Sequence, residues 1–126
     1  NRSYRGGSAG SPTNALSYGG MTSSSGTNTS LEHSFNGTTL TTSTSLPSVW
    51  AKGSQTGGAK GSAMAASGAW NNATASNSYW WSNSAWIAKA SALHALTSCT
   101  STGNPAEFAL IGGYTSTFVN HYQRYQ

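Results

Sequence analysis

The chain has only two carboxylate side chains, Glu32 and Glu107, and no aspartate. Two carboxyl groups can hydrolyse a glycosidic bond with retention when they lie about 5–5.5 Å apart, one as the acid and the other as the nucleophile. The aromatic-rich, lightly charged composition is compatible with a secreted enzyme of this kind. A retaining glycosidase that uses Glu32 and Glu107 is therefore one hypothesis for the function.

Each glutamate also has a simpler structural interpretation. The run Asn104-Pro105-Ala106-Glu107 is typical of a helix start, in which Asn104 caps the helix and Glu107 accepts a hydrogen bond from a backbone N–H. Glu32 lies in a polar stretch, which predicts a solvated charge. We therefore expect neither glutamate to be catalytic, and we expect a non-enzymatic protein.

The remaining chemistry-bearing residues form no motif. The three histidines, His33, His94 and His121, lack the spacing of a zinc site or of an acid–base pair. Cys99 is the single cysteine, so the chain has neither the pairs of a disulfide framework nor a metal-binding cluster. The sequence thus predicts a buried thiol, no metal site and no cofactor.

Aromatic side chains give the strongest functional signal. In the run Tyr79-Trp80-Trp81 the rings cannot all face one way on a strand, because Trp80 must point away from Tyr79 and Trp81. At least one ring is then directed to a surface or pocket, where it can cover the C–H face of an uncharged, hydroxylated ligand. Trp70 and Trp86 are expected in the core. The predicted ligand-binding residues are Tyr79, Trp80 and Trp81 together with Trp50, Asn77 and Asn83.

Composition limits the possible partners. Only 6% of the residues are charged, against about a quarter in an average soluble domain. The six lysines and arginines are scattered and form no basic face, so nucleic acid is not an expected partner. No apolar run approaches the roughly 20 residues of a membrane span. We expect an extracellular or secreted protein, or a subunit of a virion or cell-surface assembly.

Local patterns divide the chain into an arm and one domain. Residues 1–30 are rich in Gly and Ser and predict an ordered arm, whereas residues 31–126 predict a β-rich domain. Strand patterns cover residues 38–46, 48–52 and 114–122. Helix formers over residues 85–96 predict one late helix, and a second is expected to begin at Asn104 and to end at Gly112-Gly113. No internal repeat of fixed period is visible.

These expectations combine into one fold class and three functional hypotheses. The fold is expected to be mainly β, a single antiparallel sandwich or barrel with one or two short late helices. The first hypothesis is a non-enzymatic, extracellular-type binding domain that holds a neutral small molecule or glycan, with carbohydrate as the first guess. The second is a self-assembling structural subunit of a coat, fibre or filament, a homo-oligomer in which the arm contacts another chain. The third is the glycosidase.

Overall fold

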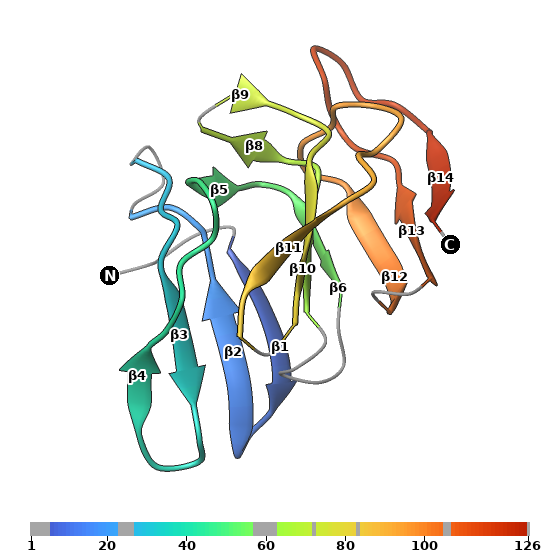
Figure 1. The fold of residues 1–126 in the computed structure, drawn as a ribbon. Helices are drawn as coiled ribbons and strands as arrows, with labels where there is room; N and C mark the ends of the chain where they lie inside the picture. The colour runs from blue at the N-terminus through green and yellow to red at the C-terminus, as the bar shows by residue number, and fades with distance from the viewer. Residues whose placement is uncertain are drawn as a thin grey trace.

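The structure is a computed structural model that describes residues 6–22, 27–56, 63–71, 73–82, 84–104 and 107–125. These residues form antiparallel strands and no helix, which confirms the mainly β fold. The first sheet is a meander of four strands in sequence order (Figure 1). Its strands are β1 (Gly7–Ser11), β2 (Asn14–Tyr18), β3 (Glu32–Phe35) and β4 (Leu40–Thr42).

Two further sheets repeat this meander. The second has the order β6-β7-β10-β11, and the third has the order β12-β13-β14. The strands β5, β8 and β9 form a small fourth sheet. In it, β5, which follows the first sheet, pairs with the β8–β9 hairpin, which lies between β7 and β10 in the sequence. The strands are β5 (Trp50–Ala51), β6 (Ser54–Thr56), β7 (Met64–Ala66), β8 (Ala69–Trp70), β9 (Ala73–Thr74), β10 (Ser78–Trp81), β11 (Trp86–Lys89), β12 (Thr100–Asn104), β13 (Glu107–Ile111) and β14 (Tyr122–Tyr125).

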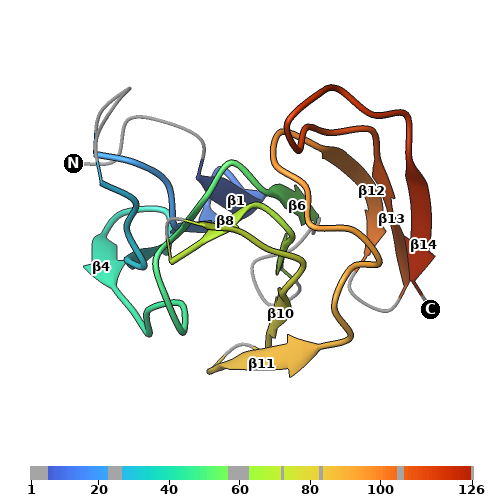
Figure 2. The same ribbon diagram turned by 90° about the horizontal axis from the view of Figure 1, so that it is seen from above.

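The three meanders radiate from a common line. The first strand of the second sheet, β6, contacts the first strands of both other sheets, β1 and β12. Seen from above, these inner strands lie together while β4, β11 and β14 lie at the outside (Figure 2). Antiparallel sheets arranged radially in this way are the blades of a β-propeller. The arrangement is therefore a fan of blades and not the sandwich or barrel that the sequence suggested.

A backbone feature recurs at the end of the second strand of each of the three meanders. There, two consecutive residues have positive φ, and the N–H of the first donates to the carbonyl just before the third strand. The pairs are Gly19-Gly20 (φ 62° and 96°), Ser67-Gly68 (53° and 91°) and Gly112-Gly113 (63° and 121°). The bonds run from Gly19 to Leu31, from Ser67 to Asn77 and from Gly112 to His121. The chain thus contains a structural repeat that sequence analysis did not find.

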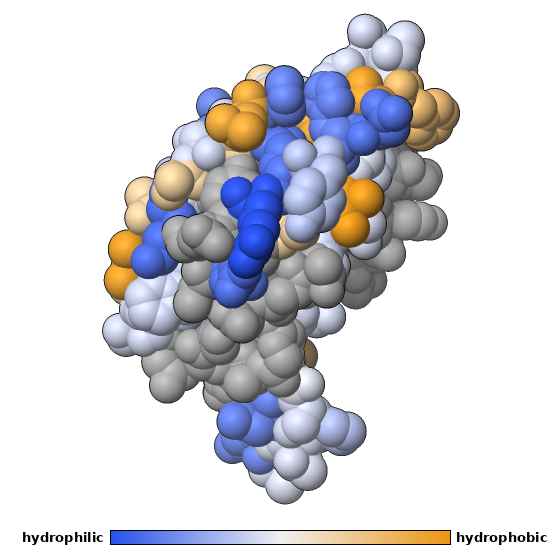
Figure 3. Space-filling view, turned by 90° about the vertical axis from the view of Figure 1, so that its right-hand side faces the viewer, coloured by the Kyte–Doolittle hydropathy of each residue, from blue (hydrophilic) through white to orange (hydrophobic). Residues whose placement is uncertain are grey.

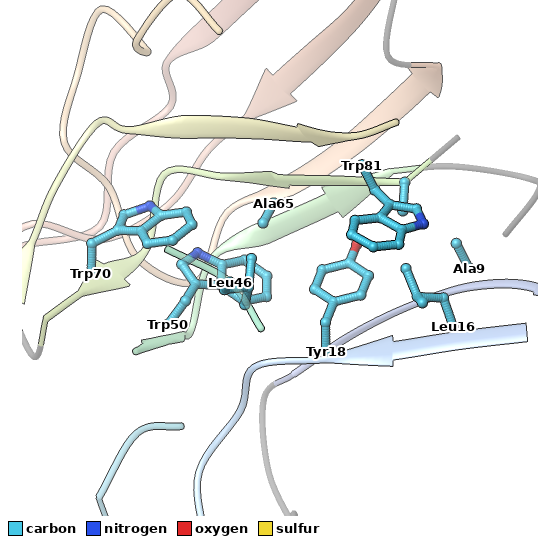
Figure 4. Packing of buried hydrophobic residues seen from close by; sticks show 9 residues of the cluster. Ala9, Leu16, Tyr18, Leu46, Trp50, Ala65, Trp70 and Trp81 are labelled. Carbon is cyan, nitrogen blue, oxygen red and sulfur yellow. The ribbon is translucent and has the colours of Figure 1, made fainter. Parts of the chain in front are cut away.

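The core lies between successive sheets in two clusters. The larger cluster joins the first sheet to the second and small sheets (Figure 4). Ala63 and Ala65 are small enough to leave room there for aromatic rings from several strands. The smaller cluster joins the second and third sheets. The larger contains Ala9, Leu16, Tyr18, Leu46, Trp50, Ala63, Ala65, Trp70 and Trp81, and the smaller contains Met64, Ala66, Ala92 and Leu110.

The predicted late helices are wrong. Residues 86–89 form β11, in which Trp86 stands opposite Trp81 and packs against Tyr18. Helix propensity is a weak preference, and a helix of about twelve residues is marginal on its own. Burial of the Trp86 ring against the first cluster outweighs it here.

The second predicted helix is replaced by the hairpin of β12 and β13. Asn104 and Glu107 are register partners at its end, so Glu107 is not a helix cap. Pro105 and Ala106 lie outside the described residues. Gly112-Gly113 ends a strand instead of a helix. The strand predicted over residues 114–122 is also wrong, since Tyr114 and Phe118 form an isolated bridge that closes a turn.

The segment predicted as an arm contributes β1 and β2 to the first sheet. Its apolar residues Leu16, Tyr18 and Met21 are buried within their own chain, whereas Tyr4 lies outside the described residues. This is the placement expected of a discrete domain and not of an arm that binds a neighbour. Among the described residues, no helix is long and apolar enough to cross a membrane.

Candidate functional site

The strand β10 separates the predicted aromatic site into two faces. Tyr79 and Trp81 pack with the cluster next to the first sheet, whereas Trp80 packs against the cluster next to the third sheet. The opposition that the sequence predicted for these three rings is therefore present. Trp81 is buried, and so is Trp50, whose ring N–H donates to the Ser67 carbonyl at 2.8 Å. Neither of these two rings is open to a ligand.

Six aromatic rings form a continuous row between the first and second sheets. Consecutive ring centroids lie 4.8–5.8 Å apart, a normal spacing for stacked or edge-to-face pairs. The half-buried rings of Tyr79 and Trp86 lie near its two ends. In order, the row contains Tyr79, Trp70, Trp50, Tyr18, Trp86 and Trp81. Most of the aromatic set that the sequence singled out is thus core.

Trp80 differs from this row. It is half-buried, and the Lys89 ammonium lies 4.9 Å from its ring centroid, within cation–π range. Ile87 stands directly opposite Trp80 in the register and is 43% exposed. These three side chains share one face of the outer strands of the second sheet, and we call them the Trp80 surface. Among the described residues the ring N–H of Trp80 has no hydrogen-bond partner.

The two predicted asparagines have different outcomes. Asn77 is exposed immediately before β10, and its backbone carbonyl accepts hydrogen bonds from the Ser67 N–H and from the Trp70 ring N–H. Asn83 lies outside the described residues. Sequence analysis missed Ile87 and Lys89, because it assigned them to a helix. The alternation along residues 86–89 could have indicated a strand, with Trp86 and Ala88 on one face and Ile87 and Lys89 on the other.

The predicted solvated charge at Glu32 is wrong. Glu32 is buried, and its Oε2 accepts a hydrogen bond from the Trp86 ring N–H at 2.8 Å. Tyr18 is its register partner in the first sheet. Burial raises the pKa of the Tyr18 hydroxyl, and the nearby Glu32 carboxylate raises that pKa further. Glu32 is therefore part of a buried polar contact beside the aromatic row.

Glu107 lies elsewhere in the molecule. It is exposed and forms an ion pair with Arg124, which raises the pKa of the Arg124 guanidinium. Glu32 belongs to the first sheet and Glu107 to the third, with the second sheet between them (Figures 1 and 2). The two carboxylates do not meet in one cleft, so the geometry gives the glycosidase hypothesis no support.

Two of the histidines lie together, and the cysteine lies against a core cluster. The rings of His94 and His121 lie 4.1 Å apart between centroids, next to Gln123, whose side-chain oxygen accepts from the backbone N–H groups of Leu93 and His94. Cys99 is half-buried against the smaller cluster. In the part of the chain that the structure describes, no three His, Cys, Asp or Glu residues gather as a metal site.

Comparisons with known proteins bear on the fold alone. No family model and no curated protein matches the chain. Among solved structures, one titled "Structure of YjhT" superposes with a TM-score of 0.70 and 17% sequence identity. The match covers 93% of this chain but 41% of the other, so this chain spans less than half the length of that protein.

Proposed function

We propose that the chain is a non-enzymatic domain that binds a neutral, hydroxyl-rich ligand, with carbohydrate as the first candidate, at the Trp80 surface. One observation carries the proposal: Trp80 is only half-buried and lies beside an exposed cation, whereas Trp50, Trp70 and Trp81 are buried. The low charge of the chain suits an extracellular or particle-surface setting.

The chemistry of the surface suits a sugar. An indole face and the Ile87 side chain can cover the C–H face of a pyranose ring. The Lys89 ammonium has three N–H donors for the hydroxyls at the rim. A ligand of this kind gains apolar contact without the charge repulsion that a cationic ligand would meet at Lys89. Catalysis is not part of the proposal.

Titration with uncharged oligosaccharides tests the proposal. Tryptophan fluorescence of the 126-residue chain is followed while soluble glucan, xylan and chitin oligosaccharides are added one at a time. We expect a saturable blue shift with at least one sugar. Trp80→Ala should weaken that binding roughly 5- to 150-fold, the range that corresponds to about 1–3 kcal/mol for a stacking aromatic.

Two controls separate binding from folding. Trp80→Tyr keeps an aromatic face and should retain most of the affinity. Tyr122→Ala removes an exposed ring of the third sheet that is not one of the three residues of the Trp80 surface, and it should leave binding unchanged. No saturable binding across the panel, or equal losses in Trp80→Ala and Tyr122→Ala, would contradict the proposal.

A further inference from the structure

The outer face of the third sheet is exposed at positions that are buried in the other two sheets. The residue before each positive-φ pair is Tyr18 in β2, Ala66 in β7 and Ile111 in β13. Tyr18 and Ala66 are buried because the following sheet covers them, but Ile111 is 42% exposed. Their register partners behave likewise: Glu32 and Ser78 are buried, whereas Tyr122 is 65% exposed. The outer face of the third sheet thus corresponds to the buried faces of the other two meanders, but no further sheet of the described residues packs against it.

Backbone hydrogen bonding shows the same asymmetry. Gly20 N–H donates to the Trp50 carbonyl at 2.7 Å, and Gly68 N–H donates to the Leu96 carbonyl at 2.6 Å. In both cases the acceptor lies on the segment that leads toward the following sheet. Gly113 is the equivalent residue of the third sheet, and no equivalent bond from its N–H occurs among the described residues. Among the described residues, the Gly113 N–H therefore lacks the hydrogen bond that Gly20 and Gly68 make to the segment before the following sheet.

The first sheet lacks a cover on its opposite face. Phe35 and Leu40 are register partners there, and Leu40 is 63% exposed. The equivalent partners in the second sheet are Trp81 and Trp86, which pack toward the first sheet. Within the chain, successive sheets pack through two kinds of face. The third sheet exposes one kind, with Ile111 and Tyr122, and the first sheet exposes the other, with Phe35 and Leu40.

We propose that these two faces bind each other between two copies of the chain. The face with Ile111 and Tyr122 of one copy packs against the face with Phe35 and Leu40 of the other, and the same contact forms a second time to close a ring. Three sheets from each copy give six, within the four to eight blades that propellers contain. A head-to-tail contact of this type stays finite only when its rotation closes.

The chemistry of the faces favours a second copy as the occupant. The contact continues the packing that already joins the first sheet to the second and the second to the third. The charged pair at the third sheet, Arg124 and Glu107, neutralises itself. Figure 3 looks from the side of β14, where hydrophobic side chains lie among polar ones near the end of the fan. Each junction would cover apolar side chains that are now exposed.

The oligomeric state of the 126-residue chain in solution tests the proposal. Light scattering after size exclusion should give twice the 13.0 kDa of one chain. Ile111→Arg and Leu40→Arg act on different faces, and each should give a monomer that keeps the far-ultraviolet spectrum of the parent. Leu93→Arg changes a residue that is 82% exposed outside both faces and should remain dimeric.

A mixing experiment establishes that the contact is head-to-tail. The Ile111→Arg chain retains its Phe35–Leu40 face, and the Leu40→Arg chain retains its Ile111–Tyr122 face. An equimolar mixture should therefore recover a dimer through the one intact junction. A parent chain that is monomeric up to high micromolar concentration would overturn the proposal. So would a dimer that Ile111→Arg disrupts while Leu40→Arg leaves it intact, since that result means that like faces pair.

Discussion

Tryptophan can fill a protein core only if its ring N–H finds an acceptor or is left unpaired at a cost. Trp50 and Trp70 donate to the backbone carbonyls of Ser67 and Asn77. Trp86 donates instead to a side chain, the buried carboxylate of Glu32. Glu32 thus serves as a hydrogen-bond acceptor in an aromatic core. The sequence alone could not predict this role, because it does not show which residues surround the carboxylate.

The Tyr18 hydroxyl gives a pH dependence at the scale of one residue. It donates to the Met64 carbonyl at 2.6 Å, and burial together with Glu32 raises its pKa above the usual value of about 10. The unfolded chain ionises this tyrosine near pH 10 while the folded chain keeps it protonated. Its contribution to stability is therefore complete below pH 10 and is lost as the pH rises through the raised pKa.

Urea unfolding between pH 7 and pH 11 measures this effect. The parent chain should lose more stability above pH 10 than Tyr18→Phe does. At pH 7 the variant should be less stable by about 0.5–1.5 kcal/mol, because it lacks the hydrogen bond to Met64. Parallel stability profiles for the two proteins across this range would contradict the assignment.

At the scale of elements, the positive-φ pairs end the second strand of each of the three meanders, and each pair is bonded to the residue before the third strand. Gly19 and Gly112 occupy equivalent positions with φ of 62° and 63°. A Cβ on Gly19 would lie 2.7 Å from the Trp50 carbonyl oxygen, whereas on Gly112 its nearest neighbour is the Val119 oxygen at 3.5 Å. A residue with a Cβ would thus have the same backbone strain at both positions, but it would meet close neighbours only at position 19.

Alanine at these two glycines separates backbone strain from steric conflict. Gly112→Ala should cost about 1–2 kcal/mol, the price of a left-handed conformation for a residue with a Cβ. Gly19→Ala should cost clearly more, because backbone and a buried ring must also move. Thermal or urea unfolding of the two variants provides the comparison. Equal losses would mean that the first sheet yields to accommodate the added carbon.

The same elements show how far the sequence could predict the fold. The β class followed from Thr-rich and aromatic runs, which lie in strands or beside them. Alanine and leucine dominate residues 85–96 and predict a helix, whereas the pairing of β11 with β10 and the packing of Trp86 against Tyr18 and Trp81 favour a strand over residues 86–89. The repeat escaped notice because Ser67 takes the place of a glycine, and because the pairs at positions 19, 67 and 112 are unequally spaced.

At the scale of the whole molecule, the second sheet packs against both the first sheet and the third. Its strand β7 directs Met64 toward the third sheet and Ala65 toward the first, so both clusters share one strand. The sequence could predict that aromatic rings replace an aliphatic core, since five tryptophans are its largest apolar groups. It could not predict which ring stays accessible, because that depends on which face of β10 lies against which neighbouring sheet. Trp80 was among the predicted residues, but Lys89 and Ile87 follow only from the register of β11.

This shared strand predicts that the three sheets unfold together. Four of the five tryptophans, all except Trp80, belong to the aromatic row beside the first sheet, so fluorescence reports mainly on that junction, whereas far-ultraviolet circular dichroism reports on all three sheets. Leu110→Ala removes a fully buried side chain of the third sheet and should cost about 2–5 kcal/mol. Because Leu110 packs against Met64 on β7, we expect both signals to shift to the same lower urea concentration. Phe118→Ala, at a residue that is 86% exposed, should stay within about 0.5 kcal/mol of the parent. If circular dichroism of Leu110→Ala instead changes before the fluorescence does, the third sheet unfolds by itself, and β7 does not couple the two clusters.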